Sequence, residues 1–143
     1  MISNSVLGQS LKVREELKQR LYGVLQGFSF VTQAVIFGSM AKGRETSESD
    51  IDLAVRGTGI LTQDQKESLI EALTLAFNRP VDVVDLMTIG QPLLDQIISH
   101  GQQVIGSSSQ WGDLVYRNIV DQEDFVPHQQ RILEGRRKAW INS

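Results

Sequence analysis

A polar loop between two strand-like segments constrains this sequence more than any other feature. Val31 to Phe37 is rich in β-branched and aromatic residues and ends at Gly38-Ser39, which predicts a buried strand that stops at a tight turn. A mostly polar stretch of ten residues follows. Asp50 to Val55 then alternates polar and apolar side chains, as a half-buried strand does. We therefore expect two strands joined by a polar loop that contains glycine.

Asp50 and Asp52 are two residues apart on the second of these segments. Because side chains alternate along a strand, both carboxylates project from one face. Like charges so close together raise a pKa or cost stability unless a cation lies between them. Oxygen ligands with no His or Cys nearby suit Mg²⁺ or Mn²⁺ better than zinc, and such an ion takes its other ligands from water and substrate phosphates. The pair therefore predicts a divalent metal site.

The loop before the aspartates supplies groups that can hold an anion. Gly38 at a strand end lets the backbone approach a phosphate closely, and Ser39 adds a hydroxyl donor at what could be the first turn of a helix. Lys42 and Arg44 are two cations in the same loop, placed to hold the distal phosphates of a nucleoside triphosphate. Ser49, directly before the aspartates, is assigned to the same nucleotide-binding group.

A third carboxylate is expected from the segment 81–86, which reads VDVVDL and predicts another strand. Asp82 and Asp85 project from opposite faces of such a strand. Only one of them can join Asp50 and Asp52, and alternation leaves open which one it is.

Hydrophobic periodicity and capping signals predict the remaining elements. We expect helices over about 5–26, 62–78 and 92–101, a short strand over 103–105, a loop over 106–109, and two helices within 110–141 that break near Pro127. A chain of 143 residues with this order of elements predicts one domain of the α/β (α+β) class, with a small mixed sheet flanked by helices.

Composition excludes several classes of protein. The sequence has no cysteine, which rules out a disulfide framework, a thiolate metal site and a cysteine nucleophile, and we expect a cytoplasmic location. The longest apolar runs are far shorter than the roughly 20 residues needed to cross a bilayer, so no membrane segment is expected. The net charge of −3 disfavours direct binding to nucleic acid.

The pattern Gly38-Ser39, ten residues, Asp50-Ile51-Asp52, followed by VDVVDL, resembles the fingerprint of DNA-polymerase-β-like nucleotidyltransferases. The short length is similar to that of the minimal nucleotidyltransferase (MNT) family, and the layout resembles the MntA-type antitoxins of HEPN/MNT toxin–antitoxin pairs. The resemblance implies a polymerase-β-like fold over residues 1–143, ATP as substrate, and two Mg²⁺ ions, or Mn²⁺, held by Asp50, Asp52 and a third carboxylate. Alignment with the family places that carboxylate at Asp82, with Asp85 as the alternative.

The same resemblance implies a function. A member of this group in a type VII-like toxin–antitoxin system transfers AMP from ATP to a tyrosine of its cognate HEPN RNase toxin, of the HepT type, and so neutralises it. Gly38 and Ser39 would hold the β- and γ-phosphates. The family loop more often reads Gly-Ser-Arg-Ala-Arg-Gly, whereas this chain reads Gly-Ser-Met-Ala-Lys-Gly, so Lys42 keeps one cation and Met40 replaces the other.

Two alternative functions stay open. The chain could transfer a nucleotide to a small molecule or an RNA end, or it could be a non-catalytic antitoxin that masks its partner sterically. The C-terminal segment, about 110–143, combines regularly spaced apolar residues with basic ones. It could pack on the domain as a closing helix, or dock an acidic or helical partner. His100 and His128 are expected to be ordinary surface residues.

Overall fold

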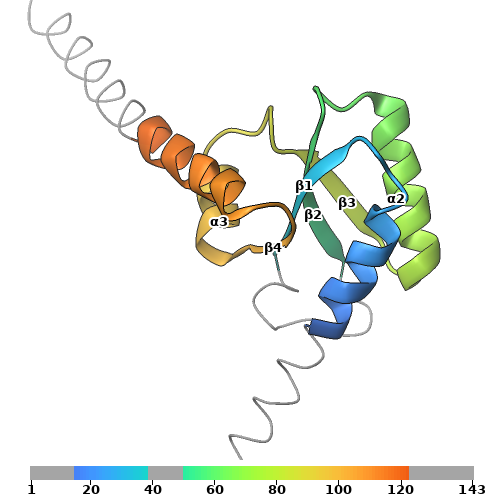
Figure 1. Cartoon of the computed structure of the whole chain (residues 1–143). Coiled ribbons are helices and arrows are strands. Elements are labelled where there is room, and N and C mark those ends of the chain that lie inside the picture. The colour runs from blue at the N-terminus through green and yellow to red at the C-terminus, as the bar shows by residue number, and fades with distance from the viewer. Residues whose placement is uncertain (1–14, 39–49, 123–143) are drawn as a thin grey trace, which may run out of the picture.

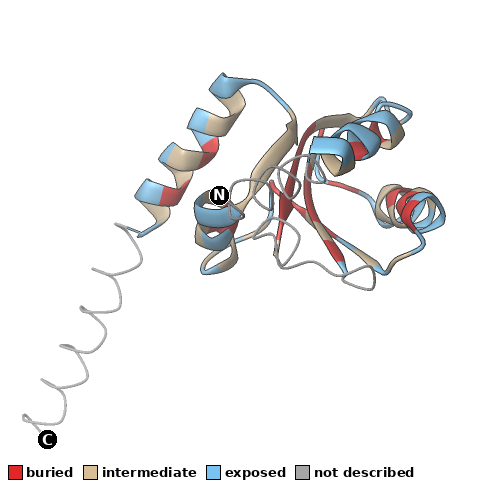
Figure 2. Ribbon diagram, turned by 90° about the horizontal axis from the view of Figure 1, so that it is seen from below, coloured by how far each residue is buried: buried red, intermediate tan, exposed pale blue. Residues whose placement is uncertain are grey.

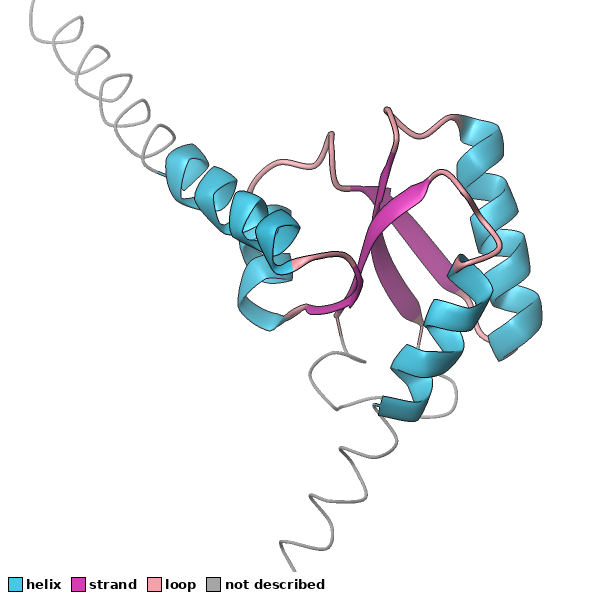
Figure 3. Ribbon diagram, in the orientation of Figure 1, coloured by secondary structure: helices cyan, strands magenta, loops and turns pink. Residues whose placement is uncertain are grey.

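The computed structural model describes residues 15–38 and 50–122, in which helices flank a four-stranded sheet (Figures 1 and 3). The strands are β1 (Val31–Phe37), β2 (Ile51–Gly57), β3 (Val81–Asp85) and β4 (Gln102–Ile105). The labelled helices are α2 (Gln63–Phe77) and α3 (Leu93–His100). Residues 15–25 and 108–122 are also helical and are called the N-terminal helix and the C-terminal helix below.

The strands have the order β3-β2-β1-β4. β1 is antiparallel to both of its neighbours, whereas β2 and β3 are parallel. The sheet is therefore mixed, and the predicted fold class is confirmed. This topology brings the last residues of β1 and the first residues of β2 and β3 to one end of the sheet, the lower end in Figure 1. We call this the aspartate end, after Asp50, Asp52 and Asp82.

Each face of the sheet is covered by two helices, as the view from below shows (Figure 2). The N-terminal helix and α2 cover one face, and α3 and the C-terminal helix cover the other. The helix residues buried in the first core are Leu21, Leu25, Leu69, Leu73 and Phe77, and those in the second are Leu94, Ile97 and Leu114.

The prediction of a half-buried strand at Asp50–Val55 is wrong in one respect. β2 is a central strand with helices on both faces, so Ala54 is as fully buried as Leu53 on the opposite face. Its start also differs, because Asp50 lies just before the strand. Asp52 and Arg56 are the two residues of β2 that stay partly exposed, and both are on the face covered by α3.

The helix predicted over 62–78 is confirmed, with Thr62 and Asn78 as its caps. The Thr62 hydroxyl accepts a hydrogen bond from the Gln65 backbone N–H at 3.1 Å, and the Gln65 side chain accepts from the Thr62 N–H at 3.0 Å. This reciprocal capping box fixes the first turn. Asn78 ends the helix in the left-handed conformation, with φ of 53°.

The loop predicted over 106–109 is too long. The C-terminal helix already begins at residue 108, because Ser107 caps it. The Ser107 hydroxyl accepts from the Gln110 N–H at 3.1 Å, and the Gln110 side chain accepts from the Ser107 N–H at 2.8 Å. The expected helical residues 5–14 and 123–141 lie outside the described ranges. Within those ranges, no helix is both long enough and apolar enough to cross a membrane.

Candidate active site

The aspartate end brings three of the predicted carboxylates together. Asp52 on β2 and Asp82 on β3 are register partners in the parallel pair, so both side chains project from the same face. The pairing continues to the start of both strands, where the Ile51 N–H donates to the Pro80 carbonyl at 2.9 Å. Asp50 is exposed and directly precedes β2. Strand pairing, rather than proximity in sequence, therefore places Asp82 beside Asp52.

Gly38 closes the site on the side of β1. Its neighbour Phe37 pairs with Asp52 across the antiparallel ladder. Gly38 has a φ of 78°, and a Cβ at this position would collide with Oδ2 of Asp52. Both the backbone conformation and the space beside the carboxylate therefore require glycine. The backbone at Gly38 is close enough to Asp52 for one ligand to touch both.

The surroundings of Asp52 disfavour its negative charge. Partial burial raises the pKa of Asp52 above its ordinary value of 3.8, and the nearby carboxylates of Asp82 and Asp50 raise it further. Desolvation is the largest of these causes. A bound cation would stabilise the charged Asp52 carboxylate, because it offsets both the repulsion from the other carboxylates and the lost hydration.

The donor set at the aspartate end fits a hard divalent cation. Asp50, Asp52 and Asp82 offer only oxygen atoms, which Mg²⁺ and Mn²⁺ prefer. As placed, no three acidic or histidine side chains in the described part of the chain converge on one point. Asp82 and Asp50 are near enough to Asp52 to raise its pKa, so rotation of the three side chains is what would bring their oxygens onto one ion.

Asp85, the alternative third carboxylate, has a different environment. It is 2% exposed and lies at the other end of β3, on the opposite face from Asp82. Its Oδ2 accepts from the Leu61 N–H at 2.8 Å, and its Oδ1 accepts from the Met87 N–H at 2.9 Å. Asp85 therefore joins the segment after β2 to the segment after β3 and is away from the other aspartates.

Other predicted site residues lie outside the described ranges, namely Ser39, Lys42, Arg44 and Ser49. His100 is exposed at the end of α3, as expected, whereas His128 is outside the described ranges. Of the segment 110–143, only residues 110–122 are described; Leu114 there is buried against the sheet, so this part packs on the domain.

Arg56 is a residue that no motif indicated. It is on the same face of β2 as Asp52, four residues further along, and its side chain lines a hollow beside the C-terminal helix. The alternation of side chains along the strand could have indicated Arg56, because it puts Asp50, Asp52 and Arg56 on one face.

Comparison with known proteins agrees with this arrangement. Residues 19–110 match the family model described as polymerase beta, nucleotidyltransferase. The chain is 33% identical over 99 residues to the protein adenylyltransferase MntA of Shewanella oneidensis. The aligned residues cover 69% of this chain and 71% of that protein.

Solved structures give the same fold. A chain in the crystal structure of a toxin–antitoxin complex with AMP-PNP is similar to this chain with a TM-score of 0.72 and 24% identity, over 82% of this chain and 96% of that one. A chain in the structure of the tri-AMPylated HEPN toxin of Shewanella oneidensis in complex with MNT antitoxin gives a TM-score of 0.69 and 21% identity, over 85% and 97%.

The match of the family model over most of the chain, the sequence identity to MntA and the aspartates at one end of a mixed sheet agree with one another. This chain belongs to the polymerase beta nucleotidyltransferase family.

Proposed function

We propose that this chain is an antitoxin that transfers AMP from ATP to a tyrosine of a cognate HEPN toxin and thereby neutralises it. The observation that carries the proposal is the in-register pair of Asp52 and Asp82 beside Gly38. Its support is the membership of the nucleotidyltransferase family together with the identity to a protein adenylyltransferase.

In the proposed reaction, Asp50, Asp52 and Asp82 would hold divalent cations, which would neutralise phosphate charge and make the acceptor hydroxyl easier to deprotonate. The acceptor oxygen forms a bond to the α-phosphorus, and the bond to the β-phosphate oxygen breaks, so that pyrophosphate leaves. Asp82 receives the proton of the acceptor hydroxyl. Gly38 lets the triphosphate approach the backbone beside Asp52. Ser39, Lys42, Arg44 and Ser49 are proposed to bind the nucleotide from the loop that follows.

A protein acceptor suits the size of this chain. Transfer of a nucleotidyl group depends mainly on positioning and on neutralisation of charge, which a small domain with bound ions can provide. The partner then brings the hydroxyl that is to be modified.

The test is an incubation of the chain with labelled ATP, Mg²⁺ and the purified cognate toxin, followed by detection of label on the toxin. We expect labelling by the wild type and none by the Asp50→Asn/Asp52→Asn variant. Asp64→Asn is the matched control, because Asp64 is an exposed aspartate in the first turn of α2, away from the aspartate end. This variant should label the toxin as the wild type does.

Two further experiments test the alternatives. Turnover with small-molecule or RNA acceptors, in the absence of any protein partner, would favour the second enzymatic function. Full neutralisation of the toxin in cells by Asp50→Ala/Asp52→Ala would favour steric masking. Equal absence of label with the wild type and the double variant contradicts the proposal.

A further inference from the structure

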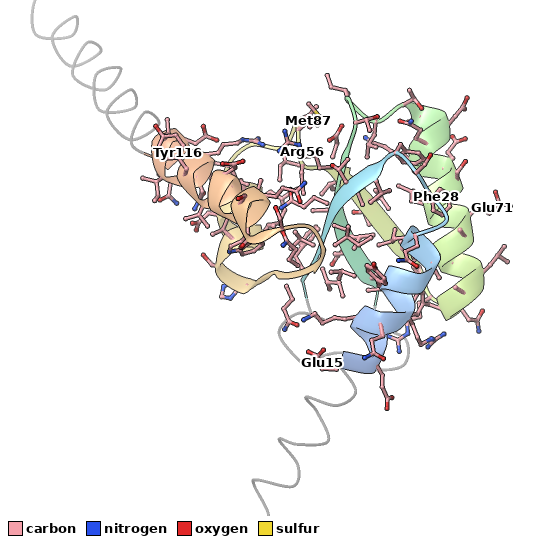
Figure 4. The ribbon with its side chains drawn as sticks, viewed as in Figure 1. Glu15, Phe28, Arg56, Glu71, Met87 and Tyr116 are labelled. Carbon is pink, nitrogen blue, oxygen red and sulfur yellow. The ribbon has the colours of Figure 1, made fainter. Side chains whose placement is uncertain are left out.

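The C-terminal end of α3 lies at the aspartate end of the sheet. Gln102, the first residue of β4, pairs with Ile36 near the end of β1. A Cβ on Gly101 would be 3.2 Å from the Ile36 carbonyl oxygen, so the residue that follows α3 touches β1. Figure 3 shows the end of α3 level with the lower end of the sheet, whereas Arg56 and Met87 lie toward the upper end (Figure 4). The last residue of α3 is therefore placed near the carboxylates.

One row of residues across the sheet joins the end of α3 to the carboxylates. Phe37 pairs with Asp52, and Asp52 pairs with Asp82. Gly101 lies beside Phe37 on the side away from Asp52, because β1 is between β2 and β4. Neighbouring strands are about 4.8 Å apart, so the backbone of Gly101 is about 10 Å from that of Asp52. Gly38, which directly follows Phe37, lies between them.

His100 is the last residue of α3 and projects from the side that faces away from the C-terminal helix. The Asp95 carboxylate marks the opposite side, because it accepts from the Asn118 amide at 3.1 Å and from the Gln122 amide at 2.9 Å. At about 100° for each residue, His100 is about 140° around the helix from Asp95 and about 60° from Ile97. Ile97 is buried against the sheet, whereas His100 is exposed. The ring of His100 therefore lies on the flank of α3, close to the sheet and open to a ligand.

The chemistry of this corner favours a phosphate as the ligand of His100. The backbone at Gly38 allows a phosphate to come close, beside the Asp52 carboxylate. The end of a helix presents carbonyl oxygens and a partial negative charge, so a phosphate near the end of α3 needs a hydrogen-bond donor there. His100 is the basic residue of the last turn, and an imidazole has an N–H donor in either protonation state. A hydrogen bond from this ring to a phosphate would be charge-assisted.

We propose that His100 binds the distal phosphates of the nucleoside triphosphate, with a ring N–H donating to an oxygen of the β- or γ-phosphate. The identity of the ligand rests on the proposed function. The α-phosphate is then at Asp52 and Asp82, and the pyrophosphate that leaves is held between Gly38 and His100. The acceptor hydroxyl approaches on the other side, along β3. His100 thereby favours a triphosphate over a monophosphate.

The test measures ligand binding by the full chain in Mg²⁺ by calorimetry, without toxin. The ligands are α,β-methylene-ATP, whose α–β linkage is not cleaved, pyrophosphate and AMP. We expect His100→Ala to weaken binding of the first two by about fivefold to tenfold, because a hydrogen bond to a charged acceptor is lost. AMP has no distal phosphate, so its affinity should change by less than about twofold, which also shows that the variant is folded.

Two further variants make the comparison sharper. His100→Gln keeps a side-chain N–H donor and should recover part of the affinity for α,β-methylene-ATP. Ser99→Ala is the control, because Ser99 is the exposed neighbour in the same turn and is only about 40° around the helix from Asp95. This variant should bind all three ligands as the wild type does.

The possible outcomes separate this proposal from the proposed function. Binding of α,β-methylene-ATP by His100→Ala at wild-type affinity overturns the role of His100, even if AMP transfer proceeds. An equal loss of affinity for AMP and for the triphosphate places the contact at the nucleoside and also overturns it, as does absence of nucleotide binding by the wild type. A loss confined to α,β-methylene-ATP and pyrophosphate, with no AMP transfer by the wild type, supports the role of His100 and contradicts the proposed function.

Discussion

At the scale of single residues, the carboxylate of Asp52 combines a functional position with an unfavourable environment. Burial, Asp82 and Asp50 all raise its pKa, so the folded state binds a proton at Asp52 more tightly than the unfolded state does. The stability associated with this group is therefore present at pH values below its ordinary pKa of 3.8 and is lost as the pH rises through the raised pKa of the folded state.

Asp52→Asn should consequently raise the melting temperature of the metal-free chain at pH 7 while abolishing nucleotide transfer. The gain should shrink as the pH is lowered through the raised pKa of Asp52, because the wild-type carboxyl then becomes protonated. Thermal unfolding in EDTA at several pH values measures this effect. A melting temperature for Asp52→Asn below that of the wild type at pH 7 would contradict the account of this site.

Asp82 and Asp85 are predicted to show opposite effects on activity and stability. Asp85→Ala should lower the free energy of unfolding by about 2–4 kcal/mol, because the Leu61 and Met87 N–H groups lose a charged acceptor. Asp82→Ala removes an exposed carboxylate and should reduce transfer by about 10²-fold or more with little loss of stability. Denaturant unfolding and transfer rates of both variants test this. A loss of activity confined to Asp85→Ala would assign the third carboxylate to Asp85 instead.

Gly38→Ala should impair the site without removing any functional group. The added methyl would be strained at a φ of 78° and would displace the Asp52 carboxylate. A displacement of about 1 Å in a reacting centre can reduce the rate by about 10²-fold. The transfer rate of Gly38→Ala, compared with Gly59→Ala at an exposed position where a Cβ would meet nothing within 4 Å, measures this. Equal rates for the two variants would show that the space beside Asp52 is not needed.

Residues differ in how far the sequence could predict their place. The alternation of side chains correctly put Asp52 on one face of its strand and Asp82 and Asp85 on opposite faces. It could not choose between Asp82 and Asp85, because the choice depends on the register between β2 and β3. That register results from the turn through Asn78 and Pro80, which no local pattern of β3 contains.

At the scale of elements, a helix start could be predicted from the sequence where its capping residues were easy to recognise. The Thr62 box was visible as a threonine followed three residues later by glutamine before an apolar run, and the helix begins there. The equivalent Ser107 and Gln110 pair is hidden among consecutive serines, so the sequence pattern predicts a loop there. The buried state of both faces of β2 was also missed, since it depends on helices that come later in the chain.

Ser107→Ala should destabilise the chain by about 1 kcal/mol, because it removes the acceptor for the Gln110 N–H at the start of the C-terminal helix. The same glutamine donates to the Thr32 carbonyl on β1, so a frayed first turn would also loosen the contact between this helix and the sheet. Denaturant unfolding is the measurement, with Ser109→Ala as the control at an exposed helical position. A stability change of equal size in the two variants would argue against the cap.

At the scale of the whole molecule, two surfaces lie on the same face of the sheet, at opposite ends of β2. The aspartate end holds Asp52 and Asp82, and the far end of β2 holds the hollow around Arg56. The length and the lack of cysteine are evident from the sequence, and the motif predicted the residues of the aspartate end. The second surface could not be predicted, because it forms only when β2, the segment after β3 and the C-terminal helix meet.

The central claim is that the aspartate end catalyses transfer of AMP to a toxin tyrosine. The most direct measurement is the intact mass of the cognate toxin, with tandem mass spectrometry of its peptides, after incubation with ATP, Mg²⁺ and this chain. The account predicts that the toxin gains the mass of one or more AMP groups, located on tyrosine, with the wild type and not with Asp52→Asn. An unmodified toxin in both reactions, or equal modification in both, would contradict it.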